Sequence, residues 1–239
     1  MVTGGSRGIG AATARGAARR GYDVCVVYRE RADAAEAVVG QCAESGVRAT
    51  ALAADVSRED DVTRLFAAVD KTLGPLTALV NNAGIVGTRS TVADLSADRV
   101  EHMLRTNVVS AFLCAREAVR RMRGRGGAIV NVSSRASTLG SPGEYVDYAA
   151  SKAAVDTLTI GLAAEVAPHG IRVNAVRPGI IDTEIHASGG QPDRAQRLAD
   201  RIPLARPGTA DEIADAILWL LSDEATYVTG ALLDVGGGR

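Results

Sequence analysis

The feature that most constrains this chain is a regular alternation of short apolar runs with longer amphipathic segments. The apolar runs are rich in valine, isoleucine, leucine and alanine and fall at 22–28, 47–53, 76–81, 128–133, 171–176 and 231–235. The amphipathic segments that separate them predict helices over 10–20, 32–44, 57–73, 98–123, 148–168 and 209–222. We expect Ser57 to cap the helix over 57–73, and Thr209 with Glu212 has the spacing of a capping box. Continuous apolar strands that alternate with helices are typical of a parallel sheet covered on both faces. The sequence therefore predicts an α/β fold with a doubly wound parallel sheet.

One domain accounts for the whole chain. Its 239 residues lie within the ~250 that a single α/β domain can reach, and no long linker divides them. The exception to the alternation is 185–207, a segment rich in glycine, proline, aspartate and arginine. Irregular segments of this length are usually functional or mobile. We expect one domain over 1–239 with a substrate lid over 185–207, in which His186 is either a substrate contact or an ordinary surface residue.

Composition and charge argue against several classes of protein. A formal net charge of −1 gives no overall field that would attract nucleic acid or anionic lipid. No apolar run reaches the ~18 residues of a membrane helix, and the start of the sequence does not look like a cleavable signal. Three isolated cysteines fit a reducing compartment, and the three histidines lack metal-ligand spacing. We expect a cytoplasmic protein that binds no nucleic acid, membrane or metal.

A glycine-rich loop near the start of the sequence predicts a dinucleotide site. Residues 3–10 read TGGSRGIG and open the first predicted helix. Glycines permit a tight turn, and a helix N-terminus offers free N–H groups to a pyrophosphate. Gly4, Gly8 and Gly10 do not follow the general GxGxxG spacing. The loop alone is therefore also compatible with an ordinary glycine-rich turn.

Two arginines favour NADP over NAD as the cofactor. Where the general dinucleotide pattern places an acidic residue on the adenosine ribose, the second strand ends in Tyr28, Arg29 and Glu30. Arg29 together with Arg7 would hold a 2′-phosphate by charge-assisted hydrogen bonds. Either arginine alone is more often a solvated surface charge, and Glu30 leaves NAD open. The sequence predicts NADP, with NAD as the alternative.

A tyrosine and a lysine at helical spacing indicate proton transfer. Tyr148 and Lys152 are four residues apart and share one helix face. The pKa of a free tyrosine is ~10, and a neighbouring ammonium lowers it by favouring the phenolate. Such a pair would exchange a proton with a substrate oxygen while a nicotinamide carries the hydride. Taken alone, this spacing is usually an ordinary surface pair, and Tyr145 has no lysine four residues later.

Several motifs follow one another in an order that resembles the short-chain dehydrogenase/reductase family. They are TGGSRGIG at 3–10, NNAG at 81–84, a serine at 134, YAASK at 148–152, NAVRPG at 174–179 and DVGG at 234–237. The likeness covers essentially the whole chain and is greatest to bacterial 3-oxoacyl-thioester reductases and to sugar or polyol dehydrogenases. It implies a Rossmann-type sheet, a small-molecule carbonyl or alcohol substrate, and assembly into a homo-tetramer or dimer.

The resemblance also implies catalytic roles for four residues. Tyr148 would be the acid–base, Lys152 would lower its pKa, Ser134 would polarise the carbonyl, and Asn107 would relay protons through water to the lysine. Ser133, at the same strand end, is the alternative to Ser134, which aligns with the second serine of the family's strand-end pair although its interval to Tyr148 is one residue longer than the family's commonest spacing. Either serine could instead bond the local backbone at the strand end, and Asn107 could make a local helix hydrogen bond.

The cofactor-binding residues implied by the resemblance lie in several turns that follow predicted strands. They are Gly4, Ser6, Arg7, Gly8, Ile9, Gly10, Arg29, Asp55, Val56, Asn81, Ala83, Gly84, Pro178, Gly179, Ile181 and Thr183. The family also has a buried strand of several apolar residues before the glycine loop, whereas only Met1 and Val2 precede Thr3 here. We expect either a severely shortened first strand or a chain that starts earlier than the printed sequence.

Two alternatives to an NADP-dependent reductase remain. One is an NAD-dependent sugar or polyol dehydrogenase, and the other is a non-catalytic NADP-binding regulator or interaction module that keeps the fold. A thioester substrate on a carrier would need a basic entrance to the site. The candidates for that entrance, which equally suit a helix C-terminus, are Arg120, Arg121, Arg123 and Arg125.

Overall fold

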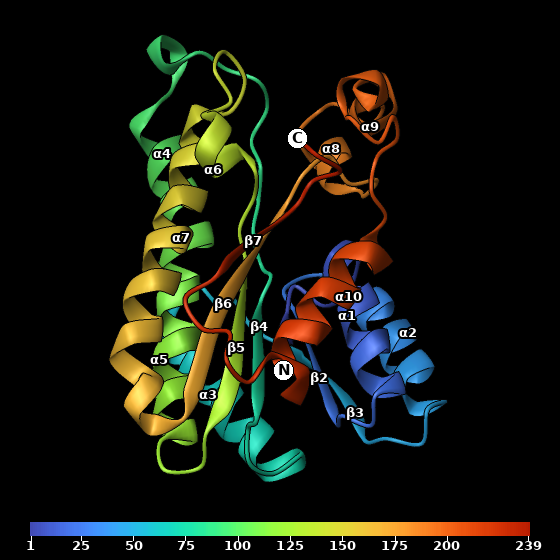
Figure 1. Ribbon diagram of the computed structural model, residues 1–239, viewed down its shortest axis with the longest axis vertical. Helices are drawn as coiled ribbons and strands as arrows, with labels where there is room; N and C mark the ends of the chain where they lie inside the picture. The colour runs from blue at the N-terminus through green and yellow to red at the C-terminus, as the bar shows by residue number, and fades with distance from the viewer.

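In the computed structural model, which describes residues 1–239 apart from the side chain of His186, the strands form one parallel sheet (Figure 1). The strands are β1 (Val2–Thr3), β2 (Val24–Tyr28), β3 (Ala49–Ala53), β4 (Ala78–Asn81), β5 (Gly127–Val132), β6 (Ile171–Pro178) and β7 (Leu232–Val235). Their order is β3-β2-β1-β4-β5-β6-β7, and every neighbouring pair is parallel. The predicted doubly wound sheet is confirmed, and its strand order reverses between β1 and β4.

Two layers of long helices cover this sheet. The helices are α1 (Gly8–Arg19), α2 (Ala32–Ala43), α3 (Glu59–Thr72), α5 (Ser110–Met122), α7 (Val146–Val166) and α10 (Ala210–Leu221). One face carries α1, α2 and α10, and the other carries α3, α5 and α7 (Figure 1). Each layer closes its own apolar core against the shared sheet. The chain is therefore a single α/β domain, as predicted.

Small residues let these helices approach closely. A Cβ at Gly16 of α1 would lie 2.5 Å from the Leu218 Cδ1 atom of α10, so the two helices meet where α1 has no side chain. A side chain at 16 would therefore require the Leu218 side chain to shift.

At its start α10 has the predicted capping box, in which the Thr209 hydroxyl and the Glu212 carboxylate each accept from the other residue's backbone N–H.

The start of α3 differs from the prediction. Ser57 was expected to cap this helix, but α3 begins at Glu59 after Arg58, and no side chain in the described part of the chain caps it. The Ser57 hydroxyl donates instead to the Asp55 Oδ1 atom at 2.6 Å. A serine that finds a carboxylate acceptor two residues away forms this local turn in preference to a cap.

The helix predicted over 98–123 is interrupted once. α4 (Ala97–Leu104) runs into a π-helical turn, η2 (Arg105–Val109), before α5 begins. A π turn inserts one extra residue into a helix and is frequent at functional sites. Asn107 lies within it and is buried.

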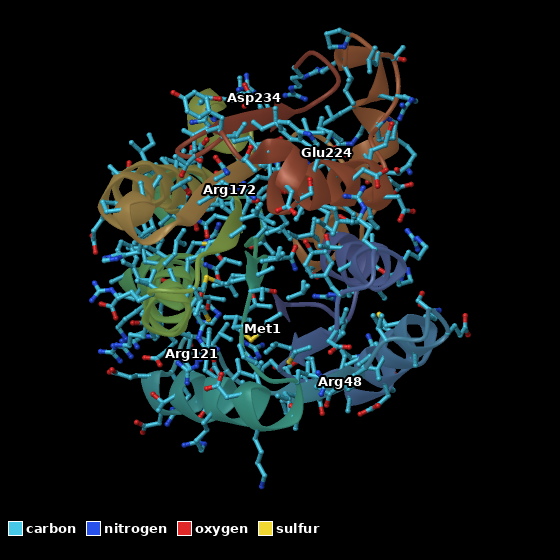
Figure 2. All side chains as sticks on the ribbon, turned by 60° about the horizontal axis from the view of Figure 1, so that its bottom comes forward. Met1, Arg48, Arg121, Arg172, Glu224 and Asp234 are labelled. Carbon is cyan, nitrogen blue, oxygen red and sulfur yellow. The ribbon has the colours of Figure 1, made fainter. Side chains whose placement is uncertain are left out.

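The first strand is only two residues long. Val2 pairs with Val26 of β2 and with Val80 of β4, and the Met1 ammonium donates to the Ala78 carbonyl at 2.9 Å. Burial lowers the pKa of that amino group. Figure 2 shows Met1 among the interior side chains, whereas Arg48 and Arg121 lie nearer the periphery. A cavity of about 260 Å³ borders Met1 at this end of the sheet.

The segment predicted as an irregular lid contains short helices. They are α8 (Ile185–Ser188), α9 (Arg194–Arg197) and the 3₁₀ turn η4 (Ala199–Arg201), and they lie beyond the carboxyl edge of the sheet (Figure 1). The remaining short helices are η1 (Val92–Asp94), α6 (Ala136–Leu139), η3 (Ala167–His169) and η5 (Asp223–Ala225). Within the described residues, no helix combines the length and the apolar character that crossing a membrane requires.

Candidate active site

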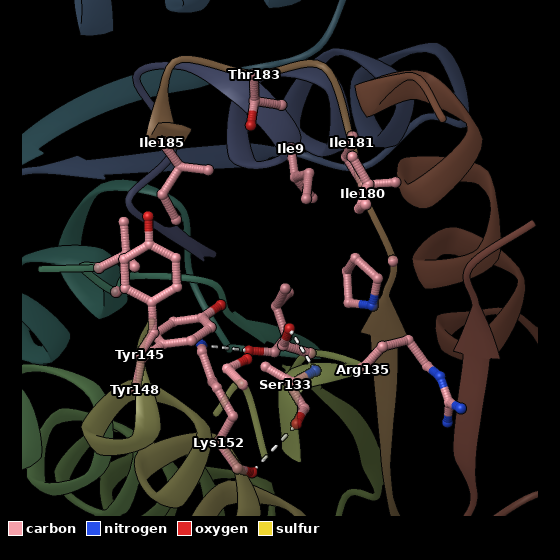
Figure 3. A pocket seen from close by; sticks show the side chains of 18 of the residues that line it. Ile9, Ser133, Arg135, Tyr145, Tyr148, Lys152, Ile180, Ile181, Thr183 and Ile185 are labelled. Carbon is pink, nitrogen blue, oxygen red and sulfur yellow. Dashed lines mark hydrogen bonds between the residues drawn. The ribbon is translucent and has the colours of Figure 1, made fainter. Parts of the chain in front are cut away.

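The largest concentration of predicted site residues lies at the carboxyl ends of the strands. Loops after β1, β4, β5 and β6 meet there around a cavity of about 170 Å³ (Figure 3). In doubly wound sheets, ligands bind outside the carboxyl ends at the point where the strand order reverses. The cavity is bordered by Gly84 near that point and by Ser134, Tyr148 and Lys152 beside it.

The glycine loop is closed by backbone contacts that leave no room for a side chain. A Cβ at Gly10 would lie 2.3 Å from the Gly4 carbonyl oxygen and 2.5 Å from the Asn82 Nδ2 atom. Gly4 and Gly8 have φ angles of 61° and 52°, which glycine adopts without steric cost. Among the described residues, no side chain caps the N-terminus of α1. Its first N–H groups are therefore available to a ligand.

Thr3 and Asn82 tie this loop to the turn after β4. The Thr3 hydroxyl accepts from the backbone N–H groups of Asn82 and Ala83, each at 3.0 Å. The Asn82 amide donates to the carbonyls of Thr3 and the next residue at 2.9 and 3.0 Å. Asn81, which was expected to contact the cofactor, donates to Asn131 Oδ1 at 2.9 Å inside the sheet. The sequence reasoning missed Asn82, although its place in NNAG was a signal.

The other predicted cofactor residues separate into two sets. The main cavity is bordered by Ile9, Gly84, Pro178, Gly179, Ile181 and Thr183. A recess of about 10 Å³ lies behind it and is bordered by Val56, Asn81, Ala83, Asn107 and Lys152. Thr183 faces the glycine loop, since a Cβ at Gly8 would lie 3.6 Å from the Thr183 Cβ. The loop after β6 and the glycine loop thus flank one end of the cavity.

The predicted adenosine end is solvated and already partly ion-paired. Arg29 is half-exposed, and its guanidinium lies 2.6 Å from a Glu30 carboxylate oxygen; Arg7 is exposed. Burial alone would raise the pKa of Asp55, but hydrogen bonds from Ser57 and the charge of Arg29 hold it below its usual range. Asp55 is therefore an anion in the neighbourhood of Arg29.

Tyr148 and Lys152 both lie on α7 and face the cavity (Figure 3). The Lys152 ammonium donates to the Val132 carbonyl at 2.8 Å and lies 5.7 Å from the centre of the Tyr148 ring. Burial raises the pKa of Tyr148, and a hydrogen bond with Ser134 only partly offsets this. The pKa of Lys152 falls to about 8, because burial lowers it more than Asp156 raises it. Burial is the main cause of the raised Tyr148 pKa, and the expectation that Lys152 lowers this pKa stays a prediction.

The two candidate serines at the end of β5 have different partners. The Ser133 hydroxyl is buried and donates to the Lys152 carbonyl at 3.1 Å. The Ser134 hydroxyl accepts from the Ala136 backbone N–H at 3.1 Å and shares a hydrogen bond with Tyr148. Of the two, Ser134 is the serine whose hydroxyl meets the tyrosine.

Asn107 is held by the chain that follows β4. Its Oδ1 atom accepts from the Ile85 N–H at 2.8 Å, and its Nδ2 atom donates to the Ile85 carbonyl at 3.0 Å and to the Ser151 hydroxyl at 3.0 Å. A Cβ at Gly84 would lie 3.3 Å from Asn107 Oδ1 and 3.4 Å from Lys152 Nζ. The absence of a side chain at Gly84 lets Asn107 and Lys152 approach one another.

The segment 185–207 contacts the chain that precedes α7. The Arg194 guanidinium lies 5.2 Å from the centre of the Tyr145 ring and 2.7 Å from a Glu144 oxygen. Gln191 donates to the Tyr145 hydroxyl. The sequence set Tyr145 aside because no lysine follows it at the right interval, yet its side chain borders the cavity (Figure 3). The expectation for His186 concerns a side chain outside the described part of the chain.

The arginine cluster considered as a carrier entrance lies at the opposite edge of the sheet. It ends α5 and precedes β5, so it belongs to the amino ends of the strands. Arg120 and Arg121 both pair with Glu117 at 2.7 Å, and Arg121 also pairs with Asp70. The cluster therefore cannot border the cavity, and its side chains support α5 and α3.

No metal centre is evident in the part of the chain that the structure describes, where no group of three or more histidine, cysteine, aspartate or glutamate side chains could hold an ion. The cysteines Cys25, Cys42 and Cys114 are free and buried. Burial raises the pKa of Cys25 to about 11 and that of Cys114 to about 12. At neutral pH these thiols are protonated and act as apolar core residues.

Comparison with known proteins agrees with this geometry. A family model described as enoyl-(acyl carrier protein) reductase matches residues 4–239. An uncharacterized oxidoreductase, YgfF, from Escherichia coli K12 is 57% identical, covering 100% of this chain and 98% of that protein. A 3-oxoacyl-[acyl-carrier-protein] reductase from Staphylococcus aureus is 40% identical, covering 100% and 96%.

Solved structures show the same fold over nearly the whole chain. A short-chain dehydrogenase/reductase from Mycobacterium marinum matches with a TM-score of 0.93 and 35% identity, covering 99% of this chain and 93% of that one. A short-chain dehydrogenase from Burkholderia cenocepacia, solved in complex with NADP, matches with a TM-score of 0.92 and 36% identity, covering 99% and 95%. This chain belongs to the short-chain dehydrogenase/reductase family of oxidoreductases.

Proposed function

We propose that this chain is an NADP-dependent oxidoreductase that interconverts a carbonyl and an alcohol by hydride transfer, with Tyr148 as its acid–base. The observation that carries the proposal is the convergence of Tyr148, Ser134 and Lys152 on one cavity, beside a glycine loop with an uncapped helix N-terminus. A proton donor, a hydrogen-bonding hydroxyl and a buried cation next to a nucleotide site are what carbonyl reduction requires.

We assign the cofactor to the glycine-loop end of the cavity. The N-terminus of α1 would receive the pyrophosphate, with Thr183 on its other side. Arg7 and Arg29 would hold the 2′-phosphate of NADP, and bound NADPH would supply the hydride. The relative from Burkholderia was solved with NADP, which supports this choice. Glu30 neutralises part of the Arg29 charge, so an NAD-dependent sugar or polyol dehydrogenase is the second candidate.

In the direction of reduction, Tyr148 gives the proton. Burial keeps its pKa above the ordinary value, so the phenol is protonated at neutral pH. Tyr148 Oη would give its proton to the carbonyl oxygen, where negative charge would develop as the carbonyl carbon is reduced. Ser134 would hold the same oxygen by donating its hydroxyl proton, which stabilises the charge that develops there.

Lys152 and Asn107 would restore that proton. The Lys152 ammonium would stabilise the phenolate left after transfer, because the two groups then carry opposite charges. The recess of about 10 Å³ that borders both residues is close to the smallest volume that holds one water. We infer that water in this recess links Asn107 and Lys152, although the hydrogen bonds of Asn107 in the structure run to Ile85 and Ser151.

The substrate end of the cavity combines an apolar wall with one polar edge. Val86, Leu139 and Ile185 form the wall, and Arg194 and Tyr145 form the edge. We propose that 185–207 acts as the lid over this end, since Gln191 and Arg194 already contact the chain before α7. Relatives named for acyl-carrier-protein, coenzyme M and acetoin substrates make a small carbonyl compound the class to screen.

We also propose that the chain assembles through α5 and α7 into a dimer or tetramer. Phe112 on α5 and Ile160 on α7 are 51% and 53% exposed, and large apolar side chains on an open helix face favour burial against a partner. A light-scattering mass equal to that of the monomer would contradict this assembly.

A screen of NADPH oxidation over ketoacyl thioesters, ketoses, quinones and ketosteroids tests the proposed reaction. With the substrate found, Tyr148→Phe is expected to lose turnover by roughly 10²–10⁴-fold, because it removes general acid–base catalysis. The control is Tyr227→Phe, since Tyr227 is fully exposed. Full turnover in Tyr148→Phe would overturn its role. Binding of NADPH without turnover of any class would support the non-catalytic module instead.

A further inference from the structure

The surroundings of the Lys152 ammonium are almost entirely neutral. From β5 it meets the Val132 carbonyl, from the turn after β4 it approaches Gly84, and from η2 it faces the Asn107 amide across that glycine. Tyr148, on α7 itself, is protonated at neutral pH. Lys152 is only 5% exposed, and a buried cation is costly without an opposite charge nearby. These neighbours provide hydrogen bonds but no such charge.

A buried carboxylate lies one helical turn beyond the lysine. Asp156 follows Lys152 by four residues on α7, so the two share a helix face, and Asp156 is also 5% exposed. Its Oδ2 atom accepts from Arg177 Nε at 3.0 Å and lies 2.9 Å from Arg177 NH2. Its Oδ1 atom is buried and has no hydrogen-bond partner among the described residues. The Arg177 guanidinium therefore binds the Oδ2 atom of Asp156 but not its Oδ1 atom.

Arg177 is itself shared between two carboxylates. It lies on β6, and its NH1 atom is 3.7 Å from an oxygen of Asp234 on β7. The other Asp234 oxygen is 2.6 Å from Arg135, the residue after Ser134. Figure 3 shows the Arg135 side chain directed away from the cavity. The result is a row of alternating charges, from Lys152 through Asp156, Arg177 and Asp234 to Arg135.

We propose that Asp156 is the counter-charge of the Lys152 ammonium, and that Arg177 limits this charge by holding the same carboxylate. Asp156 is then a positioning residue, which acts on the reaction through Lys152. The effect on turnover rests on the proposed function, whereas the charge relation itself does not. The pKa of Lys152 is about 8, lowered by burial and raised by Asp156, which agrees with a counter-charge that compensates burial only in part.

The two partners of this carboxylate should therefore have opposite effects. Asp156→Asn removes the negative charge and is expected to lower the pKa of Lys152 by about one unit. Arg177→Gln removes a nearby cation and leaves the Asp156 charge unshared, so it is expected to raise that pKa. If the Asp156–Arg177 ion pair were purely structural, both variants would lose stability to the same extent, and the Lys152 pKa would not shift in opposite directions.

The chain is well suited to a direct measurement, because its only two lysines are Lys71 and Lys152. Protein labelled with ¹³C at lysine Cε gives two signals, and Lys71→Arg assigns them. Titration of the Lys152 signal in the cofactor-free protein reports its pKa without substrate or turnover. Asp147→Asn is the matched control: Asp147 is a buried carboxylate on α7 in an ion pair with Arg99 at 2.8 Å, but it lies about 140° around the helix from Lys152.

The expected result is a lower pKa in Asp156→Asn, a higher pKa in Arg177→Gln and no change in Asp147→Asn. Shifts in the same direction, or shifts no larger than that of the control, overturn the proposal. If Asp156→Asn does not fold, Arg177→Gln decides alone, and only a raised pKa supports the proposal.

With an active substrate, the alkaline limb of kcat/KM provides a second readout. Activity that needs the Lys152 ammonium falls as pH rises through its pKa, so this limb should move to lower pH in Asp156→Asn and to higher pH in Arg177→Gln. Full turnover in Tyr148→Phe would refute the proposed function and leave the titration result intact. The two failures are therefore distinguishable.

Discussion

The two ends of the active-site cavity are built from different parts of the chain. At the glycine-loop end, backbone groups and glycines determine the shape, and Thr3 and Asn82 brace them with neutral hydrogen bonds. At the end where we propose that proton transfer takes place, the polar groups are side chains that are largely buried, such as Lys152 and Asp156. The first end tolerates little change in volume, and the second tolerates little change in charge.

The difference explains how each end can fail. A backbone site is lost when a side chain intrudes, because the close contacts leave no free volume. A buried charged site keeps its shape when a charge is removed, but the protonation states of its neighbours change. Variants that alter volume at one end and charge at the other should therefore separate cofactor binding from proton transfer.

The largest effect is expected from Gly10→Ala. The added Cβ would lie 2.3 Å from the Gly4 carbonyl oxygen, so the loop must shift, and overpacking of this kind costs about 1–3 kcal/mol. We expect NADPH to bind up to roughly a hundredfold more weakly, measured as a loss of the cofactor-induced rise in melting temperature. Gly40→Ala in α2, where the new Cβ meets open space, is the control. An undiminished rise in Gly10→Ala would contradict the backbone account of this end.

A smaller effect is expected at the solvated edge of the glycine-loop end. NADP should raise the melting temperature more than NAD at equal concentration, because the tighter ligand stabilises more. Arg29→Ala should reduce the NADP rise, corresponding to roughly tenfold weaker binding, and leave the NAD rise unchanged. Arg31→Ala, which removes an exposed arginine paired with Asp33, serves as the comparison. Equal shifts with both cofactors in the wild type would remove Arg7 and Arg29 from the cofactor assignment.

The smallest effect concerns the stability cost of the buried lysine. Its pKa is about 8 in the folded protein and ~10.4 when unfolded, so between these values the unfolded state binds more protons. The free energy of unfolding of the wild type should therefore rise relative to Lys152→Met between pH 8 and 9, by about 1 kcal/mol. The comparison with Lys152→Met cancels the opposite contribution of the buried cysteines. If the free energies of unfolding of the two proteins changed with pH in parallel, burial would not lower the pKa of Lys152.

The fold could be predicted from the sequence because each strand and helix has a local residue pattern that recurs along the chain. Apolar runs mark each buried strand of the sheet, and the Thr209–Glu212 box marks the start of α10. Strand lengths and the lid were less predictable. The sequence does not reveal that Ser57 prefers Asp55 to the start of α3, or that 185–207 forms short helices, because tertiary contacts decide both.

The candidate site was predictable in membership and less so in chemistry. The order of motifs placed Tyr148, Lys152 and Ser134 together, and the cavity brings these three together. The direction in which the Tyr148 pKa shifts could not be predicted, because the shift depends on how much of the water around the phenol is replaced by protein. Asp156 was missed for the same reason: its partner on β6 is near only after the sheet has formed.

The π-helical turn at Arg105–Val109 makes the site sensitive to chain length as well as to residue type. The turn holds one more residue than an α-helical path would need, and in a regular helix each residue turns the chain by about 100°. Deleting any residue of this turn other than Asn107 would restore regular winding and rotate Asn107 away from Ile85, although every active-site side chain would still be present. Here the residue count itself carries information, so a single-codon deletion in this stretch would be harsher than most substitutions beside it.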